Sequence, residues 1–175
     1  MDASSKYKDS LPTAPESLLE LLDKLKIGFE RYDHEPLRTV EDSKANRSRM
    51  PGFHIKNLFL RDRKKKNFLL ITQEDCSIDL KKTEKLMGCD RLSFGSAERL
   101  FEILGVRPGA VSPLALINDK ENQVGVFLDN ALKTDLTIYV HPLVNDITIG
   151  INGEDLRKFF EYSGHKPSWI DFSFS

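Results

Sequence analysis

The sequence has few cysteines and no long apolar run, and each shortage excludes a class of protein. Cys76 and Cys89 are its only two cysteines among 175 residues, too few for a disulfide framework and too isolated for a zinc site. No segment approaches the roughly 20 apolar residues that a membrane-spanning helix needs. The N-terminus also lacks the apolar core of a signal peptide. We therefore expect a cytoplasmic protein.

An excess of one charge sign is also missing. Lys and Arg total 26 against 27 Asp and Glu, a formal net charge of −1 at pH 7. This balance excludes a globally basic surface for nucleic acid, although a local basic patch remains possible. Hydrophobic residues make up 39% of the chain and charged residues 30%, which favours a folded chain, and the length is typical of one domain.

Motifs that bind phosphates, dinucleotides or metals are absent as well. The sequence contains no Gly-x-x-x-x-Gly-Lys-Ser/Thr loop, no Gly-x-Gly-x-x-Gly turn and no His-Glu-x-x-His pair. Its four histidines never occur at a metal-ligand spacing. The Gly-x-Ser-x-Gly nucleophile elbow is missing too. We expect no metal and no cofactor.

The periodicity of apolar residues predicts helices and strands in irregular order. Leu18, Leu21, Leu22 and Leu25 recur at helical spacing after a capping pattern at residues 13–16. This order predicts an α/β (mixed α+β) fold, a mixed and mostly antiparallel sheet flanked by helices. Residues 1–12 are predicted to be a flexible tail, and residues 13–175 a single domain. Further helices are predicted over residues 39–50, 80–87, 97–104 and 153–163, and strands over residues 27–32, 53–61, 67–72, 114–117, 123–128, 136–140 and 147–151.

The strand predicted from Phe53 contains the first candidate for chemistry. Strand alternation places Lys56 on the face of His54 and Leu58, and Asn57 on the opposite face. A lysine among apolar neighbours must keep its ammonium solvated, paired or directed into a polar cleft. Lys56 is therefore either an edge lysine that reaches water or a point charge aimed at a phosphate or a carbonyl.

Two loops are further candidates. His141 ends a predicted strand and precedes Pro142, at the kind of bend where active-site loops commonly start; it could equally be a turn histidine held by backbone groups. Residues 109–113 combine small residues with prolines, so their backbone amides could approach a ligand closely. An ordinary turn would explain that pattern too.

The basic residues suggest a local patch. A charged hairpin tip is predicted at residues 62–67, where lysines discourage edge pairing or meet a phosphate backbone. Cys76 and Cys89 have no basic partner nearby in sequence, and we interpret them as passive. The residues that could form a basic face are Arg47, Arg49, Lys64, Lys65, Lys66 and Arg91.

The order of these segments resembles the YbaK/prolyl-tRNA-synthetase-associated editing-domain family. Within it, the Lys-Asn pair and the Pro-Gly-Ala-Val-Ser-Pro loop are most similar to the free-standing alanyl-tRNA(Pro) deacylases. The resemblance runs from about Leu18 to Ile170. The motifs that carry it are Gly52-x-His54-x-Lys56-Asn57-Leu58-Phe59-Leu60-x-Asp62, Leu104-Gly105-Val106-x-Pro108-Gly109-x-Val111-x-Pro113 and His141-Pro142-Leu143-x-Asn145.

The resemblance implies hydrolysis of the ester that joins alanine to the 3′ adenosine of tRNA(Pro). Its implied partners are the alanine-carrying acceptor end and, transiently, prolyl-tRNA synthetase or an elongation factor; we expect a monomer. Relatives usually have small residues and threonines where this chain has Asp146, a carboxylate that would repel an anionic substrate if it faced the pocket. The implied site residues are Lys56, Asn57 and His141 for catalysis, Gly109, Ala110, Val111, Ser112, Pro113 and Asn145 for the aminoacyl group, and Arg91 for the acceptor stem.

An aminoacyl ester is already activated, so its hydrolysis requires neither a covalent nucleophile nor a metal. We expect Lys56 to be an electrostatic anchor near the terminal phosphate or the ester, and Asn57 to orient the substrate. His141 would orient groups rather than act as a base, and the ribose 2′-hydroxyl would assist the water. Ala110 and Val111 would form a floor too shallow for proline.

Three alternatives remain open from the sequence. The protein could be a deacylase for Ser, Thr, Cys or a non-protein amino acid. It could be a non-catalytic module that binds tRNA or a synthetase. A thiol-dependent enzyme using Cys76 or Cys89 is the third.

Overall fold

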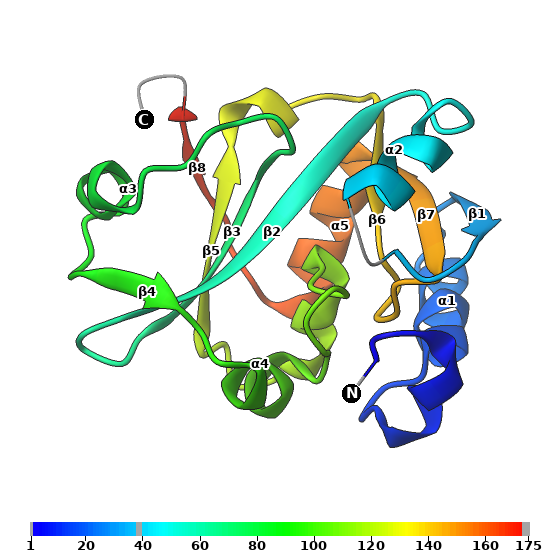
Figure 1. Cartoon of the computed structure of the whole chain (residues 1–175), viewed down its shortest axis with the longest axis horizontal. Helices are drawn as coiled ribbons and strands as arrows, with labels where there is room; N and C mark the ends of the chain where they lie inside the picture. The colour runs from blue at the N-terminus through cyan, green and yellow to red at the C-terminus, as the bar shows by residue number, and fades with distance from the viewer. Residues whose placement is uncertain (1, 38–39, 173–175) are drawn as a thin grey trace.

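A mixed sheet flanked by helices forms the body of the protein in the computed structural model, which describes residues 2–37 and 40–172 (Figure 1). The strands are β1 (Phe29–Asp33), β2 (Phe53–Asp62), β3 (Asn67–Gln73), β4 (Leu92–Phe94), β5 (Val124–Asp129), β6 (Thr137–Val140), β7 (Ile147–Asn152) and β8 (Ser168–Ile170). The helices are α1 (Pro15–Lys24), α2 (Val40–Arg47), α3 (Leu80–Met87), α4 (Ala97–Leu104) and α5 (Gly153–Ser163). Three 3₁₀ helices are η1 (Ser5–Ser10), η2 (Pro113–Asn118) and η3 (Asn130–Leu132).

The strand order is β1-β7-β6-β2-β3-β5-β8, with β4 added to β2. The pairs β1–β7, β6–β7, β2–β3 and β2–β4 are antiparallel, whereas β2–β6, β3–β5 and β5–β8 are parallel. The predicted mixed, mostly antiparallel sheet is therefore confirmed.

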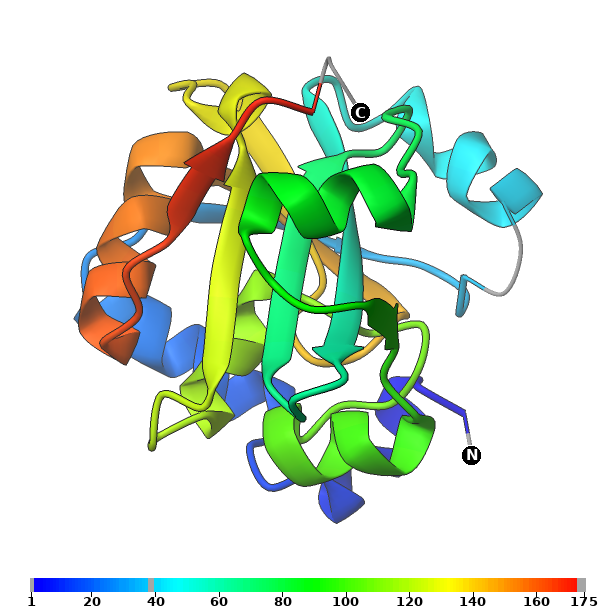
Figure 2. The ribbon, with the colours of Figure 1, turned by 90° about the vertical axis from the view of Figure 1, so that its left-hand side faces the viewer.

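The two sides of the sheet have separate apolar cores. Helices α1 and α5 cover one face, and α2 lies on the opposite side (Figures 1 and 2). The larger core joins residues of α1, α4 and α5 to the sheet, with Leu18 and Phe159 fully buried. A smaller core joins Leu60 of β2 and Leu70 of β3 to Leu92 of β4. Alternate residues of β2 face the two cores, Phe59 the larger and Leu60 the smaller, in keeping with the predicted strand alternation.

The start of β2 is fixed tightly against β6. Gly52 has φ +145°, and a Cβ there would lie 2.6 Å from the carbonyl oxygen of Thr137, so the close approach requires glycine. The His54 ring stacks on Tyr139 with centroids 4.9 Å apart, and the Tyr139 hydroxyl donates to the Pro51 carbonyl at 2.9 Å. The parallel ladder between β2 and β6 nevertheless includes only the first two residues of β2. Beyond them the two strands diverge.

One predicted strand is wrong and two strands were not predicted. Residues 114–117 belong to η2, because Pro113 begins the helix and the Ser112 hydroxyl accepts a hydrogen bond from the Leu114 N–H at 3.2 Å. This local capping outweighs the strand propensity of the segment. Strands β4 and β8 have three residues each, too few to show a period of two.

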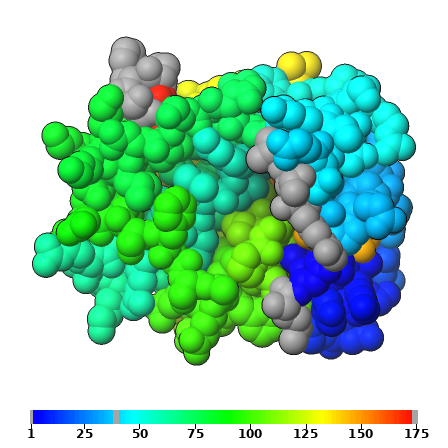
Figure 3. Space-filling view, in the orientation of Figure 1, coloured from blue at the N-terminus to red at the C-terminus, as the bar shows by residue number. Residues whose placement is uncertain are grey.

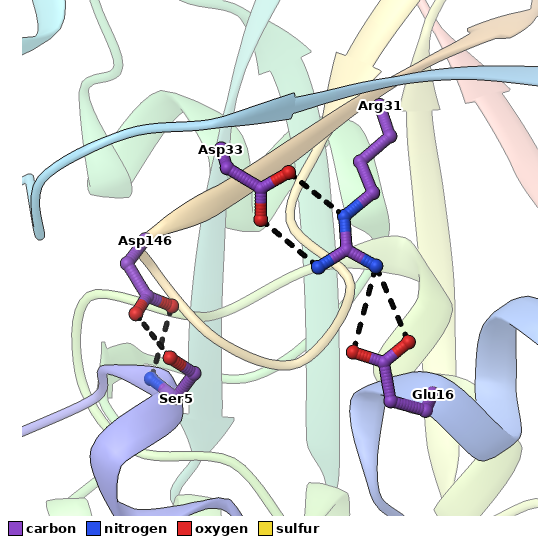
Figure 4. Close-up of polar contacts among 5 residues, drawn as sticks. All are labelled: Ser5, Glu16, Arg31, Asp33 and Asp146. Atoms are coloured by element: carbon purple, nitrogen blue, oxygen red, sulfur yellow. Dashed lines mark hydrogen bonds and ion pairs between the residues drawn. The ribbon is translucent and has the colours of Figure 1, made fainter.

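The N-terminal segment differs from the expected flexible tail. Ala3 and Ser4 are each only 5% exposed, and the Ala3 carbonyl accepts a hydrogen bond from the Asn145 N–H at 2.8 Å. The Ser5 N–H donates to the Asp146 carboxylate at 2.9 Å, and its hydroxyl donates to the same group (Figure 4). Polar contacts rather than an apolar stripe hold the segment, so hydropathy gives no sign of them.

A second polar contact links β1 to α1. Arg31 pairs with Asp33 at 2.9 Å and with Glu16 at 3.2 Å (Figure 4). These side chains are 35%, 64% and 53% exposed, respectively. Ion pairs this exposed contribute about 1 kcal/mol or less. The Asp33 contact is therefore a suitable control for the Asp146 contact.

A buried chain of polar side chains joins α5 to the start of β5. The Asp119 carboxylate accepts from the N–H groups of Gln123 and Val124, both at 2.9 Å, and lies 2.8 Å from His165 Nε2. Ser163 Oγ lies 2.9 Å from His165 Nδ1 but also donates to a carbonyl of its own helix. Asp119 and His165 are 2% and 5% exposed, so this Ser–His–Asp chain is a structural element rather than a hydrolytic centre.

The contact between Asp146 and the N-terminal segment can be tested by stability. We expect Asp146→Ala to lower the free energy of unfolding by about 1–3 kcal/mol, because two hydrogen bonds to a charged acceptor are lost. Asp33→Ala, the exposed control, should cost about 1 kcal/mol or less. Urea denaturation measures both, and equal losses would contradict the packed N-terminal segment.

The Asp119 contacts predict a pH-dependent stability. Burial alone would raise the pKa of Asp119, but hydrogen bonds from His165, Gln123 and Val124 lower it below the usual value. The stabilisation is therefore complete above the unfolded-state pKa of about 3.9 and is lost as the pH falls through the folded-state pKa. Asp119→Asn should lower the free energy of unfolding by about 3 kcal/mol near neutral pH. The loss should be smaller below about pH 4.

Urea denaturation across this pH range measures the difference between wild type and Asp119→Asn. Ser163→Ala is the control, since it keeps the carboxylate and should keep the wild-type pH profile. A cost of Asp119→Asn that stays constant into acid would contradict the lowered pKa of Asp119.

Candidate active site

A small cavity lies where β2 and β6 diverge. Its volume is about 70 Å³, room for a few water molecules or one small organic group, far below the volume of a typical drug-sized pocket. Both diverging strands and the segment around α2 contribute to its walls. The lining residues are Leu37, Ser43, Met50, His54, Ile55, Asn57, Glu74, Tyr139, Val140, His141 and Thr148.

His141 presents a hydrogen-bond acceptor at this cavity. Its Nδ1 lies 2.9 Å from the Ile147 carbonyl oxygen, and because a carbonyl only accepts, Nδ1 carries the hydrogen. Burial lowers the pKa of His141, and neighbouring His34 lowers it further. The ring is therefore neutral near pH 7, and its Nε2, which has no hydrogen-bond partner among the described residues, can accept a proton or a hydrogen bond. The sequence assigned His141 an orienting role, and the structure adds this basic nitrogen.

His34 and Thr148 form a second layer beside His141. His34 Nδ1 lies 2.8 Å from the Glu35 carbonyl oxygen, and His34 Nε2 lies 2.8 Å from Thr148 Oγ1. The two imidazole rings have centroids 6.4 Å apart. The sequence analysis did not select His34 or Thr148. Strand alternation through β7 was the only signal that could have drawn attention to Thr148.

Lys56 and Asn57 point to opposite sides of β2. Asn57 lines the cavity, and its Oδ1 is buried with no hydrogen-bond partner among the described residues. Lys56 is half-buried, and its Nζ donates to the carbonyl of Cys76. Lys56 is not a lining residue. The structure thus brings Asn57 and His141 into one cavity and leaves Lys56 behind the strand.

Asn145 supports the cavity wall instead of lining it. It is 4% exposed, and its Nδ2 donates to the Leu37 carbonyl at 3.2 Å. Gly109, with φ +94°, packs beside it, since a Cβ there would lie 3.5 Å from Asn145 Nδ2. Asn145 therefore positions Leu37, which does line the cavity.

The loop of residues 109–113 also stays outside the cavity lining. Ala110 and Ser112 are fully buried, so Ala110 offers no surface for a steric floor. Val111 is partly exposed. In Figure 3 the yellow-green atoms of this part of the chain lie beside the teal atoms of β2, in the recessed middle of the face. The loop thus borders the site without forming the cavity wall.

Asp146 does not create the repulsion that its sequence position suggested. Its carboxylate binds Ser5 (Figure 4), and it is not a lining residue of the cavity. Asp146, the residue that departs from the pattern of the relatives, therefore holds the N-terminal segment against the domain.

The basic residues divide into two groups. Lys64, Lys65 and Lys66 are exposed at the β2–β3 turn, and Arg91 is exposed beside it, next to the Asp62–Leu92 pair of β2 and β4. Strand β2 has ten residues, so this group lies roughly 30 Å from the strand's other end. Arg47 lies at that other end, half-buried in an ion pair with Glu74.

The pKa values of the two cysteines disfavour thiol chemistry. Burial raises the pKa of both Cys76 and Cys89, which leaves little reactive thiolate near neutral pH. Among residues 2–37 and 40–172, no three His, Cys, Asp or Glu side chains gather as metal ligands would. In the same ranges, every helix is too short or too polar to cross a bilayer.

The chain has sequence relatives among known proteins. Prolyl-tRNA editing protein ProX of Acetoanaerobium sticklandii is 35% identical over 153 residues, which cover 87% of this chain and 93% of that protein. Prolyl-tRNA synthetase associated domain-containing protein 1 of Danio rerio is 35% identical over 157 residues, covering 89% and 85%.

A solved structure shares the fold. It is described as a candidate trans-editing enzyme for prolyl tRNA synthetase and superposes with a TM-score of 0.66 at 15% identity, covering 91% of this chain and 98% of that one. The family model of the aminoacyl-tRNA editing domain matches residues 34–159. With the divergent strands and the small cavity between them, the chain belongs to the aminoacyl-tRNA editing domain family.

Proposed function

We propose that the protein is a cytoplasmic trans-editing deacylase that hydrolyses Ala-tRNA(Pro). The observation that carries this proposal is the cavity of about 70 Å³ with Asn57 and His141 in its wall. A cavity of this size accepts a small aminoacyl group and no large ligand. The relative named prolyl-tRNA editing protein supports proline tRNA as the carrier.

Hydrolysis needs a positioned water and donors for the charge that develops on the ester carbonyl. In the proposed reaction, His141 Nε2 accepts a hydrogen bond from the attacking water, with the ribose 2′-hydroxyl assisting. The Asn57 amide donates toward the carbonyl oxygen. Water adds to the carbonyl carbon, the bond to the ribose oxygen breaks, and that oxygen leaves with a proton. Lys56, on the opposite side of β2 from the cavity, anchors the terminal phosphate outside the cavity once it is released from the Cys76 carbonyl.

Selectivity follows from the size of the cavity. A synthetase site built for proline discriminates against the smaller alanine by only about 1–3 kcal/mol. Alanine lacks a methylene or two, so it fits the site without a steric clash. A second site that is too small for proline corrects this mischarging. It admits and hydrolyses the alanyl ester and excludes the correct prolyl ester. Serine and cysteine are similar in size to alanine, so their esters belong in the same assay.

Single-turnover deacylation tests the proposal. Wild type should release alanine from Ala-tRNA(Pro) and leave Pro-tRNA(Pro) intact. Asn57→Ala should slow alanine release by about 100-fold, the effect of losing one donor to a developing oxyanion. Lys56→Ala should slow release as well, through weaker anchoring. Cys76→Ser is the control and should keep the wild-type rate, since the Cys76 contact to Lys56 uses the backbone carbonyl.

The outcomes separate the alternatives. Wild type that binds tRNA(Pro) without turnover would support the non-catalytic module. Full activity of Lys56→Ala would remove the anchoring role, and loss of activity in Cys76→Ser would revive a thiol mechanism.

His141 predicts a pH profile for the reaction. Because the pKa of His141 is lowered, the neutral ring predominates above the usual histidine value of about 6.5. The enzymatic rate, corrected for buffer hydrolysis, should therefore stay level with respect to this group near neutral pH and fall only in more acidic solution. If the rate already falls as the pH is lowered from above about pH 7, His141 is not neutral near pH 7.

A further inference from the structure

Among the described residues, the cavity lining offers hydrogen-bond acceptors and one carboxylate. That carboxylate belongs to Glu74, and no described lysine or arginine lines the cavity. Asn57 Oδ1 is buried without a partner. Thr148 Oγ1, which lies 2.8 Å from His34 Nε2, keeps lone pairs for the cavity when it donates to that nitrogen. Such a lining suits a small cation that carries several hydrogens.

Glu74 is held in place at the wall of the cavity. Its backbone N–H donates to the His54 carbonyl at 2.9 Å, directly after the end of β3. Arg47 of α2 pairs with its Oε2 from outside the cavity lining. The side chain is 27% exposed, so a ligand can reach the carboxylate.

The substrate of the proposed reaction carries a matching cation. An aminoacyl ester has an α-ammonium group on the carbon next to the carbonyl under attack, with three hydrogens that need acceptors in a partly desolvated site. We propose that Glu74 binds this α-ammonium group, assisted by Asn57 Oδ1, and so makes the enzyme selective for esters with a free amine. This inference rests on the proposed deacylase function and names a recognition residue within it.

Arg47 makes a contact that the sequence did not predict. Its ion pair connects α2 to Glu74 beside the cavity, while the tRNA contact expected for it stays a prediction. Its guanidinium holds the carboxylate without entering the cavity. Arg47 is therefore a positioning residue, and Glu74 is the group that touches the substrate.

The test compares two esters that differ at a single group. Ala-tRNA(Pro) and lactyl-tRNA(Pro), in which a hydroxyl replaces the ammonium, are assayed in single turnover, each rate divided by its buffer rate. Wild type should prefer the alanyl ester. Glu74→Gln should reduce this preference by about tenfold or more, the effect of a charge-assisted hydrogen bond, by slowing alanyl hydrolysis while leaving lactyl hydrolysis within about twofold of wild type.

Two control variants isolate the carboxylate. Asp75→Asn removes an equal charge from the neighbouring exposed residue and should keep the wild-type preference. Arg47→Gln breaks the ion pair but keeps the Glu74 carboxylate, so it should weaken the preference for the amine less than Glu74→Gln does. These controls separate amine recognition from long-range charge and from loss of the ion pair.

Each result decides the inference. Loss of the preference in Glu74→Gln alone supports it. An unchanged preference, an equal loss of both rates, or the same loss in Asp75→Asn overturns it while the deacylase function stands. A wild type that hydrolyses neither ester, nor any other small aminoacyl ester, overturns the proposed function itself.

Discussion

The two-residue parallel pairing between β2 and β6 is the constraint on which the site depends. Gly52 lets the strands approach closely enough to pair, and the stacking of His54 on Tyr139 fixes that contact. After this pairing, β2 turns to β3 and β4, while β6 continues into the loop that starts at His141. The cavity is the space left where the two strands diverge. The course of the backbone therefore creates the site, rather than a side-chain motif.

Polar groups divide between those that hold the fold and those that remain available. Asp119 and Asp146 are carboxylates whose partners are inside the protein, three for Asp119 and the Ser5 groups for Asp146. Asn57 Oδ1 is buried without a partner at the cavity. Because an unsatisfied buried acceptor is costly, Asn57 Oδ1 is available to a water or a substrate group in the cavity. The same reasoning separates the Ser–His–Asp chain, which is saturated, from the cavity around His141.

The charge distribution suits an anionic polymer with a cationic end. The exposed lysines of the β2–β3 turn and Arg91 lie far along the sheet from the cavity, where a nucleic-acid backbone could meet them. The cavity lining contains one described carboxylate, Glu74, which is paired with Arg47. An overall charge of −1 therefore coexists with a local basic group at the opposite end of β2. In the proposed reaction the ester is already activated, so it needs orientation and a water.

The sequence by itself determined the helices, through their periodicity and caps. It also determined that Lys56 and Asn57 lie on opposite faces of their strand, through strand alternation. The order of three motifs indicated the family. These features depend on residues close together in the chain. Only the tertiary structure decided that Lys56 lies behind the strand, that Asn145 positions Leu37, that Asp146 binds the N-terminal segment, and that Glu74 reaches the cavity. Those contacts join residues from separate elements, and the physical reason is that strand pairing and divergence, which no local pattern encodes, choose which side chains meet.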